Sequence, residues 1–171
     1  TVFNNTKAFC ALKSDDTIIC WGSSYYGGTT PSNNSGIVSV YGSIISFIAL
    51  RSDGTVISWG NEAFGGGLPG GFPNGTQINP IVSVSTTAYG FCALKSDGTV
   101  ACWGNSSYGG ITPTVEEGNS DIVSVYNNQR SFCALKSDGT VITWGESVYG
   151  GDLTHSTYGL KGQVNGTDSP I

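Results

Sequence analysis

Charged side chains are scarce in this sequence. Asp, Glu, Lys and Arg make up 11% of its 171 residues, and the formal net charge is −5. Soluble domains typically carry about 25% charged residues. The sequence contains no run of Lys or Arg that could neutralise phosphates, which excludes a basic nucleic-acid-binding surface. We therefore expect no nucleic-acid partner.

Long apolar stretches and methionine are also missing. No apolar run approaches the roughly 18 residues of a membrane-spanning helix, so we expect no membrane span. The absence of methionine means that there is no initiator residue, which predicts a processed product or an excised segment. No segment shows a helical hydrophobic period with caps, which speaks against an α-helical domain.

Histidine is nearly absent, and few catalytic or metal sites can be built without it. His155, the one histidine, lies in a stretch without repeat pattern and has no nucleophile motif around it. Glu116 and Glu117 are adjacent in sequence, and a solvated loop explains them better than an acid–base pair. A zinc site needs four convergent ligands. We expect no catalytic residues, no metal and no cofactor, and a protein that is not an enzyme.

Glycine and internal repetition are what this sequence has in abundance. Glycine accounts for 26 residues, roughly twice its usual share of ~7%. Four segments are close copies that end in Trp-Gly: Phe9–Gly22 (FCALKSDDTIICWG), Phe47–Gly60 (FIALRSDGTVISWG), Phe91–Gly104 (FCALKSDGTVACWG) and Phe132–Gly145 (FCALKSDGTVITWG). An aromatic-Gly-Gly triplet follows each copy, and a short apolar strand precedes the last three. We predict a single repeat domain over 1–171, with repeats 1–38, 39–82, 83–123 and 124–171.

Each copy contains a predicted β-hairpin. Ser-Asp-Gly stands between two apolar runs in three copies, and a three-residue hairpin loop places a left-handed residue, usually glycine, at its end. The first copy has Asp16 there, and Asp tolerates that conformation better than most residues. This turn pairs Cys10 with Cys20 and Phe9 with Trp21. Both faces of the hairpin are then apolar, so neighbouring sheets must cover both, as in propeller blades or solenoid coils.

The five cysteines follow the repeat. Cys10 and Cys20, and likewise Cys92 and Cys102, occupy a cross-strand pair, and the second copy lacks both members together. Paired gain and loss is what a disulfide requires, and each bridge would stabilise the fold by roughly 3 kcal/mol in the chain-entropy model. Buried free thiols are the alternative. Cys133 has no local partner, which predicts an intermolecular bond or a free thiol.

N-glycosylation sequons point to a secretory setting. Five candidate acceptors are present: Asn4, Asn33, Asn74, Asn105 and Asn165. Three of them occupy the same variable loop, between the Gly-Gly signature and the next apolar strand. A loop whose length differs among repeats projects from one edge of an array. Together with the paired cysteines, the sequons favour a secreted, extracellular glycoprotein.

The repeated pattern resembles a known family. Apolar-Ser-apolar, then Phe-x-Ala-Leu-Lys-Ser-Asp-Gly-Thr-Val, then Trp-Gly and aromatic-Gly-Gly resembles the regulator of chromosome condensation repeat superfamily, especially its divergent extracellular or microbial members. The resemblance covers all four repeats and implies all-β propeller blades, either as a closed four-bladed ring or as part of a longer repeat array. Seven blades are common in that family, so four is a departure. Its namesake's nuclear exchange-factor role would want a basic tail, and this sequence has none.

Aromatic and charged positions recur with the blades. Four tryptophans lie in strict phase on an apolar strand face, which predicts the core between blades: Trp21, Trp59, Trp103 and Trp144. Five aromatics lie nearer the rim and are better candidates for a contact surface: Tyr25, Tyr26, Phe64, Tyr108 and Tyr149. Each hairpin tip places a cation two residues before an aspartate, as in Lys13 and Asp15. Turn chemistry explains these aspartates without a ligand.

Two functional classes follow from the sequence. The first is a non-enzymatic, extracellular, glycosylated structural repeat protein that self-assembles into a filament or surface coat. Its end-to-end contact or ring closure would run through Thr1, Val2, Pro170 and Ile171, because Thr1-Val2-Phe3 matches part of a repeat strand. The alternative is a secreted β-propeller binding module that recognises a protein or glycan through its loop face.

Overall fold

The protein is built of short antiparallel sheets. The computed structural model describes residues 1–70, 72 and 78–152, and within them the chain forms four three-stranded sheets. Each sheet, with the 3₁₀ helix that follows it, is one blade. In each blade the strands pair in sequence order, so an inner, a middle and an outer strand form a meander. The predicted all-β architecture of four propeller-blade repeats is confirmed.

The blades have the following bounds. Blade 1 contains β1 (Val2–Asn4), β2 (Ala8–Leu12), β3 (Ile18–Gly22) and η1 (Ser24–Tyr26). Blade 2 contains β4 (Ile37–Gly42), β5 (Ser46–Arg51), β6 (Val56–Gly60) and η2 (Glu62–Phe64). Blade 3 contains β7 (Ile81–Thr86), β8 (Gly90–Lys95), β9 (Val100–Gly104) and η3 (Ser106–Tyr108). Blade 4 contains β10 (Ile122–Asn127), β11 (Ser131–Lys136), β12 (Val141–Gly145) and η4 (Ser147–Tyr149).

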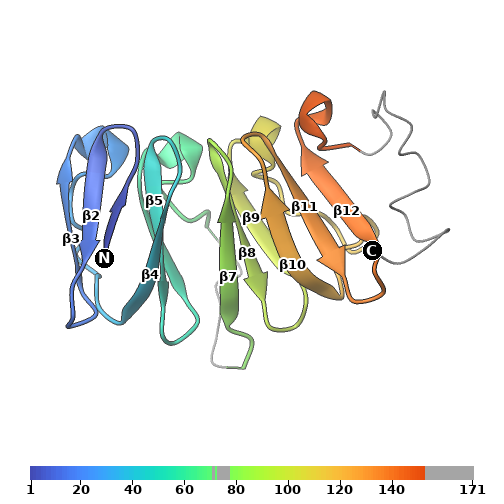
Figure 1. Cartoon of the computed structure of the whole chain (residues 1–171), viewed down its shortest axis with the longest axis horizontal. Helices are drawn as coiled ribbons and strands as arrows, with labels where there is room; N and C mark the ends of the chain where they lie inside the picture. Colours follow the sequence, from blue (N-terminus) through green and yellow to red (C-terminus); the bar gives the residue numbers. More distant parts are fainter. Residues whose placement is uncertain (71, 73–77, 153–171) are drawn as a thin grey trace.

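The four blades stand in a row. Figure 1 shows blade 1 at one end and blade 4 at the opposite end, with the inner strands β1, β4, β7 and β10 following one another. The described residues therefore form an open row and not a closed four-bladed ring. The bounds of the four repeats remain a prediction.

The hairpin register is the one that the turn residues predict. Cys10 pairs with Cys20, and Phe9 pairs with Trp21. Asp16 adopts a left-handed φ of 59°, and Gly54 at the same position of blade 2 has φ 78°. A Cβ atom on Gly54 would lie 2.2 Å from the Cβ of Pro80, so this tip also needs glycine because the next blade packs against it.

The aromatic-Gly-Gly signature forms a 3₁₀ turn in every blade. In blade 1 the turn ends at Gly27, whose φ is 85° and whose N–H donates to the carbonyl oxygen of Ser24. These helices were not expected from the sequence. Three residues are shorter than one period of an amphipathic helix, so they leave no periodic signal. The available signal for these turns was the glycine of the signature, because glycine commonly ends a helical turn in the left-handed conformation.

The hydrophobic core lies between the blades. The blade 1 face that carries Cys10 and Ile18 packs against the blade 2 face that carries Phe47 and Trp59. The same arrangement joins blade 2 to blade 3 and blade 3 to blade 4. Each blade thus has a cysteine-position face and a Phe-Trp face, and at all three interfaces the cysteine-position face of one blade meets the Phe-Trp face of the next. Both faces of the hairpins in blades 2 and 3 are therefore covered, as the apolar pattern requires.

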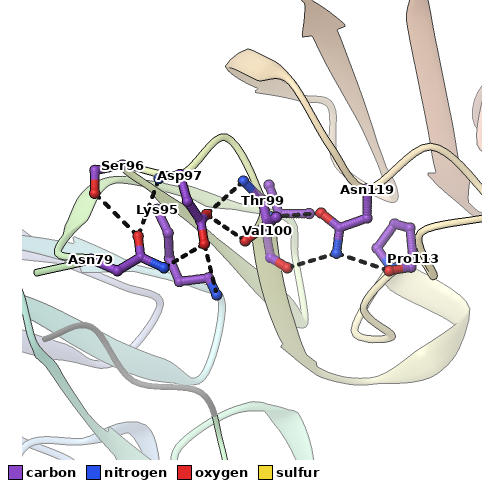
Figure 2. A network of polar contacts seen from close by, with 8 residues as sticks. All are labelled: Asn79, Lys95, Ser96, Asp97, Thr99, Val100, Pro113 and Asn119. Atoms are coloured by element: carbon purple, nitrogen blue, oxygen red, sulfur yellow. Dashed lines mark hydrogen bonds and ion pairs between the residues drawn. The ribbon is translucent and has the colours of Figure 1, made fainter.

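Side chains from the loop after η3 complete the outer edge of blade 3. Asn119 is buried; its Oδ1 accepts from the N–H of Val100 at 2.7 Å, and its Nδ2 donates to the carbonyl oxygens of Val100 at 3.1 Å and Pro113 at 2.9 Å. Figure 2 shows Asn119 in this position beside the hairpin tip of blade 3. Thr112 Oγ1 accepts from the N–H of Cys102 at 2.8 Å. These bonds occupy backbone groups at the outer edge of β9 that a further strand would otherwise pair.

Candidate functional site

The two predicted disulfides are present and lie inside the interblade cores. Cys10 is bonded to Cys20, and Cys92 is bonded to Cys102. All four cysteines are buried in clusters that include the Phe-Trp face of the next blade. Cys133 occupies the same position of blade 4 and is a free cysteine. Its register partner is Thr143, whose buried Oγ1 has no hydrogen-bond partner. Burial raises the pKa of the Cys133 thiol.

One contact recurs at all three interblade interfaces. The indole Nε1 of Trp59 donates to the carbonyl oxygen of Gly27 in the previous blade at 2.9 Å. Trp103 and Trp144 make the equivalent bonds to Gly65 and Gly109, each at 3.2 Å. In each case a phenylalanine of the same blade stacks on the tryptophan, as Phe47 does on Trp59 with ring centroids 5.6 Å apart.

A backbone ladder crosses the same interfaces. The N–H of Thr6 donates to the carbonyl oxygen of Ile44 at 3.4 Å, and Ile44 N–H donates to Ala88 at 3.0 Å. Ala88 N–H donates in turn to Gln129 at 2.8 Å. These residues occupy one position in the loop between inner and middle strands. The ladder therefore has a direction, from each blade to the next.

The Phe-Trp face of blade 1 is exposed. Phe9 and Trp21 are each 46% exposed, and Ile19 beside them is 53% exposed. The prediction that all four tryptophans form interblade core is therefore wrong for Trp21. Trp59 and Trp103 are buried, and Trp144 packs against the core between blades 3 and 4. Trp21 differs because no described blade precedes blade 1 to cover it.

The cysteine-position face of blade 4 is open as well. A hollow of about 260 Å³ lies on it, lined by Tyr126, Asn128, Cys133, Tyr149 and Gly150 among others. A Cβ atom added to Gly150 would have nothing within 4 Å. At the three equivalent glycines such an atom would touch the phenylalanine of the next blade, at 2.6 to 2.9 Å. The hollow is thus the place that a following blade's Phe-Trp pair fills elsewhere in the row.

Aromatic rings and one arginine form a stripe along the rim of the 3₁₀ turns. The ring centroids of Phe64 and Tyr89 are 4.9 Å apart, and those of Tyr89 and Tyr108 are 4.8 Å apart. The Arg130 guanidinium lies over Tyr108 at 5.2 Å and over Tyr149 at 4.7 Å. The stripe thus runs across two interblade boundaries.

Three residues of the rim were not predicted from the sequence. Lys7, Tyr89 and Arg130 each stand two residues before the first phenylalanine of a copy. Lys7 lies over the ring of Tyr26 at 5.1 Å. The Arg130 guanidinium also bonds the Glu146 carboxylate at 2.8 Å, and this hydrogen bond raises the pKa of Arg130. All three residues occupy the same position of the repeat. This shared position was the signal that could have predicted them, although the residue type varies there.

The aspartates of the hairpin tips serve the turns. Asp15 Oδ1 accepts from the Thr17 hydroxyl at 2.6 Å and from the Thr17 N–H at 3.1 Å. The hydroxyl bond, with help from Lys13, lowers the pKa of Asp15 to about 2. Hydrogen bonds from the following threonine lower the pKa of Asp53 in the same way. At Asp97 burial raises the pKa, but bonds from threonine and asparagine side chains outweigh it. Figure 2 shows these bonds around Asp97.

The remaining candidate residues are scattered. Asn4 and Asn33 are exposed, whereas the Asn105 side chain accepts from the N–H of Ser107 at 2.9 Å and caps η3. Glu117 accepts from the N–H of Thr114 at 2.7 Å, so it serves a loop turn. Five predicted positions lie outside the described residues: Asn74, His155, Asn165, Pro170 and Ile171.

Two further features are absent from the described part of the chain. There, no three His, Cys, Asp or Glu side chains gather in a way that could hold a metal ion. No helix within residues 1–70, 72 and 78–152 has the length and apolar character that crossing a membrane requires.

Comparison with known proteins agrees with this architecture. The family model of the regulator of chromosome condensation (RCC1) repeat matches residues 81–109, which run from β7 through η3 of blade 3. A search of curated proteins finds no match. The matched segment and the solved structures described next make the chain an RCC1-like β-propeller repeat protein, as the resemblance implied.

Three of the solved structures with a similar fold are compared with this chain. The ectodomain of the receptor kinase CR4 from Physcomitrella patens has a TM-score of 0.59 and 22% identity, over 83% of this chain and 39% of that one. The ectodomain of the Arabidopsis thaliana receptor kinase ACR4 has a TM-score of 0.57 and 20% identity, over 84% and 51%. Prp20p from Saccharomyces cerevisiae has a TM-score of 0.61 and 17% identity, over 85% and 44%. The chain thus spans between about two fifths and one half of the length of these relatives.

Proposed function

We propose that this chain is a non-enzymatic, extracellular structural repeat protein that assembles through its blade faces into a filament or surface coat. One observation carries the proposal. The interface between blades occurs three times within the described residues. Its Phe-Trp half is exposed on blade 1, and its cysteine-position half on blade 4 is only partly buried, with a hollow beside Gly150. Surfaces that are complementary but different make heterologous contacts, which either close a ring or propagate.

Disulfide bonds and N-glycosylation sequons support the extracellular setting. Cys10–Cys20 and Cys92–Cys102 are both bonded, and structural disulfides persist in oxidising compartments. Asn4 and Asn33 are exposed acceptors within sequons, as a glycoprotein requires. Two of the similar folds are ectodomains of receptor kinases, so propeller blades of this type serve outside cells in those proteins.

The test of assembly is the mass of native material as a function of concentration. We expect light scattering to show species larger than one chain that grow as concentration rises, and negative-stain electron microscopy to show filaments with a regular repeat. Chains that stay monodisperse monomers at high concentration would contradict the proposal. Material secreted from eukaryotic cells should also lose mass on treatment with an N-glycosidase, and no loss would contradict the glycoprotein assignment.

A second candidate function is a secreted binding module for a protein or glycan. The stripe of Phe64, Tyr89, Tyr108, Arg130 and Tyr149 favours it, because aromatic rings and arginine are typical of binding hot spots. Tyr149 is 43% exposed, whereas Phe64, Tyr89 and Tyr108 are partly buried. Binding to a glycan array that is lost in Tyr149→Ala and kept in Ile78→Ala would support this function over assembly.

A further inference from the structure

We infer that two copies dock head to tail, with the Phe-Trp face of blade 1 of one copy seated on the open face of blade 4 of the other. This inference rests on the proposed self-assembly and specifies its contact. The occupant is a second copy because every covered blade face in the row is covered by the chain's own repeat. Blade 1 offers Phe9, Ile19 and Trp21, and blade 4 offers Cys133 and Gly150, at the positions that already meet three times.

The first contact is that of the tryptophan. Each covered tryptophan donates its indole N–H to the carbonyl oxygen of a left-handed glycine in the previous blade, as Trp144 does to Gly109. Gly150 ends η4 in the same left-handed conformation, with φ 86°. Trp21 is the tryptophan left exposed. In the docked pair, the Trp21 N–H of one copy therefore donates to the Gly150 carbonyl oxygen of the other.

The hollow on blade 4 fits this contact. In the row, the ring of Phe132 lies where a Cβ on Gly109 would touch it, at 2.6 Å. Phe9 holds the same place on blade 1 and stacks on Trp21 with centroids 5.6 Å apart, as its counterparts do. The blade 1 pair is thus already arranged as in the covered interfaces. No rearrangement of Phe9 and Trp21 is needed before they fill the hollow beside Gly150.

The second contact extends the backbone ladder. Its rungs run from Thr6 to Ile44, from Ile44 to Ala88 and from Ala88 to Gln129, always from N–H to the next carbonyl oxygen. The next rung joins the Gln129 N–H of one copy to the Thr6 carbonyl oxygen of the other. Because the ladder has a direction, it fits blade 4 to blade 1 and not two copies of the same face.

The third contact lies at the rim. Tyr108 of blade 3 receives the Arg130 cation of blade 4 over its ring. In the docked pair, Lys7 of blade 1 takes the place of Arg130 and lies over Tyr149 of the other copy. A cation over an aromatic ring is attracted by the ring quadrupole. The charge pattern of the rim thus also agrees with head-to-tail order.

The test uses one variant for each face. Ile19→Asp places a charge on the blade 1 face, where Ile19 is 53% exposed. Leu135→Asp does so on the blade 4 face, where its counterpart Leu94 is buried in an interblade core. Ile78→Asp is the matched control, because Ile78 is 96% exposed in a loop. Each variant is first checked for an unchanged circular dichroism spectrum and thermal transition.

Sedimentation distinguishes the outcomes. We expect each face variant alone to associate at least tenfold more weakly than the wild type, and the Ile78→Asp control to match it. An equimolar mixture of the two face variants should form a dimer and nothing larger, because one intact blade 4 face meets one intact blade 1 face. A mixture that stays monomeric, or a face variant that still forms polymers, overturns the inference.

A second measurement blocks the blade 4 face with a chemical label instead of a charged substitution. Reaction of Cys133 with a bulky maleimide should reduce association at least tenfold, whereas Cys133→Ser treated in the same way should associate like the untreated wild type. If neither the label nor the face variants change assembly, the proposed self-assembly is still supported but this contact is refuted. Absence of any wild-type assembly would instead refute the proposed function together with it.

Discussion

At the scale of residues, one position takes different roles in different blades. The site of Cys10 and Cys92 is a buried disulfide, whereas Cys133 is a half-buried free thiol beside Thr143. Two differences separate blade 4 from blades 1 and 3 here. The register partner is threonine instead of cysteine, and no described blade covers the face. The first difference can be reversed by one substitution.

Thr143→Cys should create a third disulfide. The register that bonds Cys10 to Cys20 places residue 143 opposite Cys133, so the new thiol meets the free one. Closing this short loop should raise the free energy of unfolding by about 2–3 kcal/mol in the chain-entropy model. Thiol titration of the unfolded protein should fall from one free thiol to none, and reduction should remove the added stability. Thr143→Ser is the control, and two titratable thiols in the variant would contradict the prediction.

Acid should loosen the hairpin tip of blade 1. The Thr17 hydroxyl bond, aided by Lys13, holds the pKa of Asp15 at about 2, below its ordinary value of 3.8. A carboxylate whose pKa is lowered by folding stabilises the native state above pH 4, and this stabilisation is lost as pH falls toward 2. Thermal unfolding at pH 5 and pH 2 should therefore show a smaller difference in Thr17→Val, and a nearly unchanged one in Thr17→Ser. An equal pH dependence in all three proteins would refute this account.

At the scale of elements, each blade is a three-stranded meander whose outer edge needs cover. In blade 3 that cover comes from loop side chains and not from a strand, with Asn119 bonded to both backbone groups of Val100. In blade 1 Asn34 donates to the carbonyl oxygen of Ile18 at 3.2 Å, and Thr30 accepts from the N–H of Cys20. Such side chains protect an edge strand from pairing with another chain.

Asn119→Ala should be strongly destabilising. It would leave the N–H and C=O of Val100 without partners in a buried place, and each unsatisfied buried group costs about 1–3 kcal/mol. We expect the free energy of unfolding in urea to fall by about 2–4 kcal/mol. Asn79→Ala is the comparison, because Asn79 bonds the exposed tip of the same blade, and it should cost less than about 1 kcal/mol. Equal effects of the two substitutions would contradict the edge role of Asn119.

At the scale of the whole molecule, stability comes from contacts between neighbours. Each core cluster joins two consecutive blades, as in repeat proteins whose units contact only their neighbours. A blade inside the row is covered on both faces, whereas blade 1 and blade 4 each keep one open face within the described residues. The loss of stability on substituting the same residue type should therefore depend on which blade contains it.

Trp103→Phe and Trp21→Phe should differ sharply. Trp103 is 1% exposed and its indole N–H bonds the carbonyl oxygen of Gly65, so the shorter ring leaves a cavity and an unpaired oxygen. We expect a loss of about 2–3 kcal/mol in the free energy of unfolding. Trp21→Phe should change the stability of dilute protein by less than about 0.5 kcal/mol. Similar losses in dilute protein would show that blade 1 is covered after all.

Local features of this protein were determined by the sequence alone. The hairpin register, the left-handed tip residue and the two disulfides follow from spacing within one copy of the repeat, where chain geometry leaves few choices. Only the tertiary structure decided which copy of a repeated residue is buried. Trp21 and Trp103 stand in nearly identical segments, yet one is exposed and the other buried. The reason is that burial depends on what a neighbouring blade places against the side chain, and nothing within a single repeat encodes its place in the row.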